Sequence, residues 1–202
     1  MPLVIDETWL PAILTVGPMT DDAFAEFCAE HPDLFFEMTA EGELIVMPPN
    51  FTLTDARNGK IYFQLEAWAC RDGRGIVNGP TGGFVLPSGA RRSPDAAWSA
   101  KTRIGQLDPA TLERFWHLCP DFVIELRSHT DRLSVLRAKM REWIDNGAQL
   151  AWLIDPDRRA VEIFRPGAGA DIRPEAQSVE GEGPVTGFTL DLRPVWEPLS
   201  HS

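Results

Sequence analysis

Residues 121–128 read DFVIELRS, and this stretch decides the fold that we expect for the chain. Its apolar run carries a single acid, Glu125, and such a run is typical of a central strand buried on both faces. Side chains alternate along a strand, so Glu125 and Arg127 should emerge on the same side. A buried carboxylate is costly unless it is paired, hydrogen-bonded or bound to metal. Glu125 therefore indicates a functional site, a structural contact with Arg127, or an edge open to water.

Downstream of this strand, apolar residues recur at helical spacing from about 131 to 146, and Gly147 follows as a stop signal. Two strand-like runs come next, LAWLID (150–155) and AVEIFR (160–165), joined by a short polar turn. The remaining residues, 167–202, are expected to form a loop and a C-terminal extension with room for another strand pair.

Upstream of DFVIELRS, a helical pattern covers about 54–71. Short strands are expected near 75–78, 83–86 and 95–98, separated by Gly, Pro and Ser turn signals. Because only short turns separate these three strands, we expect them to form a β-meander.

The N-terminal part of the chain adds two smaller units. The runs LFFEM (34–38) and ELIVM (43–47) predict a β-hairpin in which Gly42 supplies an unusual φ. Before it, residues 19–32 predict a short helix capped by Thr20.

Length and composition set the broad class of the protein. The 202 residues are 44% hydrophobic, which suits one α/β domain spanning 1–202 with a core at about 34–166. The net charge of −11 weighs against tight nonspecific binding to nucleic acid. No signal-like N-terminus, no long apolar run and no paired cysteine spacing is present, so we expect a cytoplasmic protein with reduced thiols and no membrane association.

A second acid, Asp95, follows Pro94 at the start of the strand expected near 95–98, about thirty residues before Glu125. Strands at this separation can lie side by side in a small sheet, which would bring the two carboxylates together. Mg²⁺ and Mn²⁺ prefer such oxygen ligands, and the backbone carbonyl of Leu126 is a candidate third ligand. For Asp95 alone, the alternative is an ordinary turn or strand-start role.

Several stretches between residues 35 and 166 stand in a distinctive order. They are FFEMTAEGELIVMPP (35–49), RRSPDAAW (91–98), FVIELRS (122–128), LRAKMREWIDNGAQLAWLIDP (136–156) and AVEIFRP (160–166). Together they resemble a large bacterial family of restriction-endonuclease-like proteins, abundant in cyanobacteria and formerly classed as a domain of unknown function. Pro94-Asp95 and Glu125-Leu126-Arg127 resemble a variant of the Pro-Asp…(Asp/Glu)-x-Lys signature of the PD-(D/E)XK nucleases.

This resemblance implies an α/β fold with a restriction-endonuclease-like αβββαβ core, a mixed central sheet, helices on both sides, and an N-terminal helix and β-hairpin extension. The chain departs from the wider superfamily at Arg127, which stands where a lysine is usual and which cannot act as a base. The resemblance offers Lys139 as the relocated lysine, and Glu37 as a further ligand or site-lining residue. Without the resemblance, Lys139 would be interpreted as a lysine whose stem covers the core.

The resulting hypothesis is a metal-dependent endonuclease that hydrolyses DNA. Asp95, Glu125 and the Leu126 carbonyl would bind Mg²⁺ or Mn²⁺, Lys139 would orient water or neutralise charge, and Arg127 would position the phosphate. Two alternatives stay open: a nuclease-like fold kept as a binding or assembly module, and a metal-dependent hydrolase of a small phosphorylated substrate, which suits the acidic charge better. Small nucleases often act as symmetric pairs, so a homodimer is expected.

Overall fold

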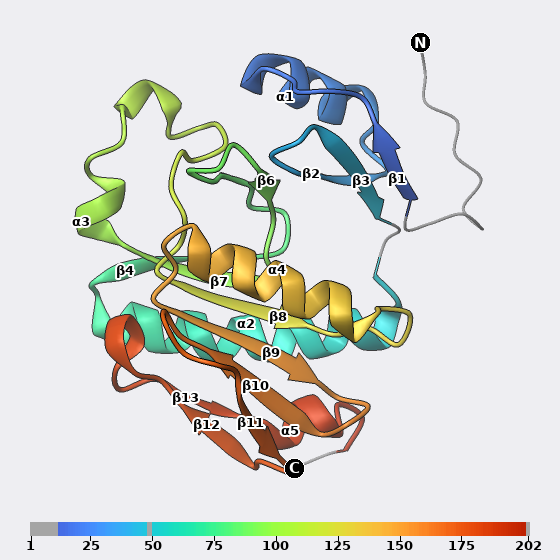
Figure 1. Cartoon of the computed structure of the whole chain (residues 1–202). Helices are drawn as coiled ribbons and strands as arrows, with labels where there is room; N and C mark the ends of the chain where they lie inside the picture. Colours follow the sequence, from blue (N-terminus) through green and yellow to red (C-terminus); the bar gives the residue numbers. More distant parts are fainter. Residues whose placement is uncertain (1–11, 48–49, 201–202) are drawn as a thin grey trace.

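The computed structural model describes residues 12–47 and 50–200, and Figure 1 shows how their helices and strands are arranged. The first eleven residues, on which part of the localisation prediction rests, lie outside this range. A six-stranded sheet forms the centre, in the order β11-β10-β9-β8-β7-β4. Its strands are β4 (Gly75–Asn78), β7 (Ala96–Ala100), β8 (Phe122–Leu126), β9 (Leu150–Asp155), β10 (Ala160–Phe164) and β11 (Asp171–Pro174). Strands β8 and β9 are parallel and the other neighbours antiparallel, so the predicted mixed sheet is confirmed.

Two long helices cover opposite faces of this sheet (Figure 1). Helix α2 (Thr52–Asp72) ends at Gly73, which adopts a left-handed φ of 75° that glycine tolerates without strain. Helix α4 (Leu133–Asp145) packs on the other face. Strand β8 serves both layers, because Ile124 packs on the α2 side and Val123 on the α4 side. The order α2-β4-β7-β8-α4-β9 matches the expected αβββαβ core.

The N-terminal part forms a second sheet in the order β1-β3-β2-β6-β5, with α1 (Asp21–Glu30) packed against it. The predicted hairpin is confirmed as β2 and β3, and the Thr20 hydroxyl caps α1 by accepting from the Ala23 N–H. The strands are β1 (Ala12–Thr15), β2 (Phe35–Met38), β3 (Glu43–Met47), β5 (Phe84–Val85) and β6 (Arg91–Arg92).

The predicted β-meander is wrong. Strand β4 pairs directly with β7, while β5 and β6 leave the central sheet and join the N-terminal one. Two ion pairs link β6 to the N-terminal unit: Arg91 pairs with Asp21 of α1, and Arg92 pairs with Glu37 of β2. Such partners lie far apart in the sequence, so local pattern alone could not reveal them.

The C-terminal residues contain a strand pair, for which the sequence left room, and they also add to the core. Strand β12 (Ser178–Glu180) pairs with β13 (Thr189–Asp191), and α5 (Arg193–Trp196) packs on α2. Phe188 and Leu190 are fully buried on the α2 side of the sheet. The short helix α3 (Lys101–Ile104) and 3₁₀ turns at Pro109–Thr111 and Gly183–Val185 complete the described elements.

Among the helices of the described residues, none combines the length and apolar composition needed to span a bilayer. Cys28, Cys70 and Cys119 are all free thiols, as the sequence predicts.

Candidate active site

Asp95 lies where β7 and β8 separate. The ladder between these strands ends at the pair Ala96–Ile124, and the next backbone donor on β8, the Leu126 N–H, donates to Asp95 Oδ2 at 2.7 Å. The amide nitrogen of Asn58, on α2, donates to the other carboxylate oxygen at 2.9 Å. These two donors fix the position of the carboxylate.

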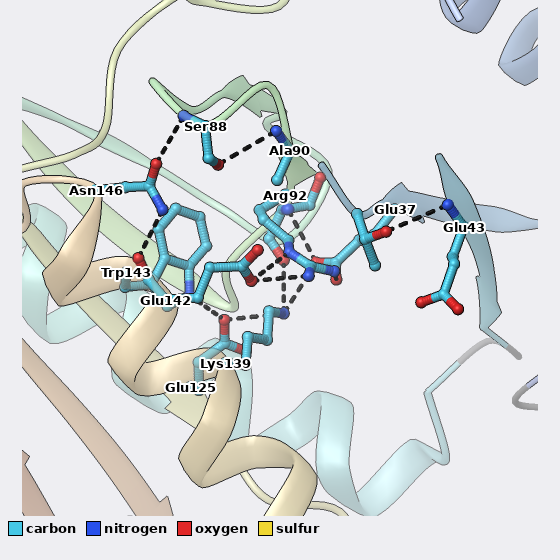
Figure 2. Close-up of polar contacts among 12 residues, drawn as sticks. Glu37, Glu43, Ser88, Ala90, Arg92, Glu125, Lys139, Glu142, Trp143 and Asn146 are labelled. Carbon is cyan, nitrogen blue, oxygen red and sulfur yellow. Dashed lines mark hydrogen bonds and ion pairs between the residues drawn. The ribbon is translucent and has the colours of Figure 1, made fainter. Parts of the chain in front are cut away.

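Glu125 lies two residues beyond Val123 on the α4 side of β8 and is buried. Its Oε1 accepts a hydrogen bond from the Trp143 indole at 2.9 Å and forms an ion pair with Lys139 Nζ at 2.9 Å (Figure 2). Lys139 and Trp143 are one helical turn apart on α4, so both reach the same carboxylate.

Lys139 connects the two sheets. Its Nζ lies 2.8 Å from Glu37 Oε1 on β2 as well as 2.9 Å from Glu125 Oε1 on β8 (Figure 2). The lysine side chain is 14% exposed, and both acids are nearly inaccessible. The structure thus brings Glu37, Glu125 and Lys139 into direct contact.

Arg92 completes this arrangement from β6. It reaches Glu37 Oε2 at 3.1 Å and Glu142 Oε2, on α4, at 2.7 Å, while the Ser93 N–H donates to Glu37 Oε1 at 3.0 Å. Glu37 is therefore held on all sides by protein donors and fixes the position of the Lys139 ammonium.

The sequence matches the Uma2 family, described as "Putative restriction endonuclease", over residues 21–193. The chain belongs to the Uma2 family. Among solved structures, it is similar to the crystal structure of "a putative nuclease belonging to DUF820" from Anabaena variabilis, with 18% identity and a TM-score of 0.71. That match covers 89% of this chain and 98% of the other, and it shows a shared fold. No curated protein matches the sequence significantly.

The electrostatics of this Uma2 chain differ among the three acids. Burial raises the pKa of Asp95 in spite of its two hydrogen bonds. Burial also raises the pKa of Glu125, to about 7, although the Lys139 ammonium opposes the shift. For Glu37, burial acts in the same direction, but Lys139 and Arg92 outweigh it and leave the pKa below its usual value. Of these three acids, Asp95 and Glu125 are the two for which nearby positive charge does not offset the effect of burial on the pKa.

The donor set fits a hard divalent cation. Asp95 and Glu125 come from adjacent strands, both are desolvated, and hard cations prefer carboxylate oxygen. Within residues 12–47 and 50–200, no three His, Cys, Asp or Glu side chains are grouped as a metal site. Any further ligands would have to be backbone, amide or water oxygens. The role of the Leu126 carbonyl as a metal ligand stays a prediction. What the structure shows is that the Leu126 N–H donates a hydrogen bond to Asp95.

Arg127 is engaged elsewhere. Its guanidinium donates to Asp155 at 3.0 and 3.2 Å and to the Asp131 carbonyl at 3.2 Å. The partners of Glu125 are Lys139 and Trp143. The alternative that the sequence left open, a structural contact between Glu125 and Arg127, is therefore not observed. A role for Arg127 in positioning phosphate stays a prediction.

Sequence reasoning missed Arg92, Trp143 and Asn58 as members of this site. Two of them had a signal: Arg92 lies three residues before Asp95, and Trp143 is one turn from Lys139 on the apolar face of the predicted helix. Asn58 had none, because nothing in the local pattern of α2 distinguishes it from a solvated polar residue.

Proposed function

We propose that this Uma2 protein is a divalent-metal-dependent nuclease that hydrolyses phosphodiester bonds in DNA, with Asp95 and Glu125 holding Mg²⁺ or Mn²⁺. The observation that supports the proposal is the placement of two carboxylates with raised pKa values on adjacent strands, one of them paired with the Lys139 ammonium. Membership of a family described as "Putative restriction endonuclease" supports the nuclease class.

When bound, the metal ion supplies an activated water and neutralises charge at the phosphate. Asp95, fixed by Asn58 and the Leu126 N–H, and Glu125, fixed by Trp143, provide pre-organised ligands. Pre-organisation matters because a misplaced ligand loses much of the rate gain.

Lys139 acts as a cation and hydrogen-bond donor. Burial alone would lower its pKa, but Glu125 and Glu37 outweigh burial and raise it, so the amine stays protonated. A permanently protonated amine cannot abstract a proton from water. Its role is to orient the attacking water or to offset the charge that develops on the phosphate, and Glu37 holds it in that position.

The test is cleavage of plasmid DNA by the purified chain with Mg²⁺ or Mn²⁺. Asp95→Asn and Glu125→Gln should each lose at least about 100-fold in rate. Asp145→Asn is the matched control, because it makes the same chemical change at an exposed position on α4 and should keep full activity. Full metal-dependent cleavage by either site variant would overturn the assignment.

The substrate is tested separately, since the net charge of −11 favours a small phosphorylated substrate over long DNA. Parallel assays with DNA, RNA and a generic phosphodiester separate these cases. Cleavage of the generic phosphodiester alone would support the small-substrate hydrolase. A chain that binds neither Mg²⁺ nor Mn²⁺ at millimolar concentration would support a non-catalytic binding module.

Sedimentation analysis tests the predicted homodimer.

A further inference from the structure

Asn58 carries a buried amide oxygen that has no hydrogen-bond partner among the described residues. The residue lies on α2 and is 5% exposed. Its amide nitrogen is in use, because it donates to Asp95 Oδ1 at 2.9 Å. A buried polar atom without a partner costs free energy, so native proteins rarely leave one unsatisfied without a reason.

The orientation of this amide follows from the chemistry of Asp95. An ionised carboxylate only accepts hydrogen bonds, so the NH₂ group of Asn58 must face it. The oxygen of the same planar group is then left beside the carboxylate with no protein donor. Rotating the amide would place its oxygen against the carboxylate oxygen, which is repulsive.

Other buried oxygens without partners in the described chain are Asn78 Oδ1 and Ser99 Oγ. Neither belongs to a side chain that donates to a carboxylate of the candidate site. Asn58 is different because one half of its amide is bound to Asp95 while the other half is unsatisfied.

Among the residues that the structure describes, no group of three acidic, cysteine or imidazole side chains could hold a metal ion. Amide oxygens are ordinary ligands of hard divalent cations, either directly or through a bound water. We infer that Asn58 is part of the metal site: its nitrogen orients Asp95, and its oxygen contacts the cation or a water bound to it. This inference rests on the metal binding in the proposed function.

The experiment measures Mn²⁺ binding to the full chain by titration calorimetry, which requires no catalytic activity. Asn58→Leu keeps the side-chain volume but removes both amide atoms, and it should weaken Mn²⁺ binding about 10- to 100-fold. Asn58→Asp keeps an oxygen but loses the donor, and it should bind within about tenfold of the unmodified chain. Gln64→Ala is the control, because Gln64 is another α2 amide that hydrogen-bonds at Asp191.

Thermal melting in EDTA establishes that each variant folds, and Asn58→Ala serves as a second removal of the amide if Asn58→Leu does not. Binding by Asn58→Leu or Asn58→Ala that equals the unmodified chain would overturn the inference and leave the proposed function standing. Equal weakening in Asn58→Leu and Asn58→Asp would also overturn it, since it would reduce Asn58 to a donor for Asp95. Absence of Mn²⁺ binding in the unmodified chain would instead overturn the proposed function.

Discussion

Replacing Lys139 with methionine tests the electrostatics of the site directly. The ammonium lies 2.8 Å from Glu37 and 2.9 Å from Glu125, and all three side chains are largely removed from water. Methionine keeps most of the stem, so the loss is mainly one of charge. Removing one partner of a buried ion pair costs about 3–5 kcal/mol. At about 2–4 °C per kcal/mol for a chain of this size, the melting temperature in EDTA should fall by roughly 6–20 °C.

The size of this loss should depend on pH. Beside Lys139, burial already raises the pKa of Glu125 to about 7, and without the ammonium the pKa should rise further. A carboxyl whose pKa is raised by folding stabilises the fold fully below its unfolded pKa, and this contribution is lost as the pH rises through the folded pKa. In the unmodified chain this loss is nearly complete just above pH 7, whereas in Lys139→Met it continues to higher pH. The deficit of Lys139→Met in chemical denaturation should therefore be larger at about pH 8 than at about pH 5.

Arg141→Met is the matched control, because it removes one positive charge from an exposed position on the same helix. It should change the free energy of unfolding by no more than about 0.5 kcal/mol. Mn²⁺ should restore part of the stability of Lys139→Met, since a bound cation replaces the missing charge. A deficit below about 1 kcal/mol, or one equal at both pH values, would refute the reasoning.

Two further predictions concern stability away from the site. Burial would raise the pKa of Glu162, but hydrogen bonds from Arg137 and Arg158 hold it below its usual value. Glu162→Gln should therefore cost about 2 kcal/mol near neutral pH, less than a fully buried pair because both arginines are partly exposed. That cost should disappear as the pH falls through the folded pKa, which denaturation at neutral and acidic pH will show. Gly75→Ala would place its Cβ 2.1 Å from the buried Trp98 indole. It should cost about 1–3 kcal/mol by thermal melting, and an unchanged melting temperature would mean that the indole can move aside.

Much of the core could be predicted because its signals are local. The apolar run of β8 marks a central strand, and the helical spacing before Gly147 marks α4. The predicted convergence of Asp95 and Glu125 rested on one further assumption, that strands about thirty residues apart are neighbours. The register confirms this assumption, since Ala96 pairs with Ile124.

The rest depended on contacts between distant residues. The partners of Arg92 are Glu37 and Glu142, which lie about fifty residues away on either side, and no local pattern encodes that choice. The same holds for Asn58, whose partner Asp95 is on another element. The β-meander was wrongly predicted for the same reason, because β6 pairs with the distant strand β2 and β5 pairs with β6.

The balance of charge around Lys139 differs from that around Arg127. Toward one end of the helix, Asp155 and Glu162 face three arginines, so this group carries a formal charge of +1. Around Lys139, the interacting acids outnumber the cations. The acids are Glu37, Asp95, Glu125, Asp131 and Glu142, and the cations are Arg92 and Lys139.

An excess of negative charge in a buried site is unfavourable, and it can be relieved either by protonation or by a divalent cation. Burial, together with the charges of Asp95 and Glu37, raises the pKa of Glu125 to about 7 in spite of Lys139. Lys139, on α4, reaches Glu125 and Glu37 together, whereas Arg127 pairs with Asp155. The positive charge beside Glu125 therefore comes from α4 and not from the strand end that carries Arg127.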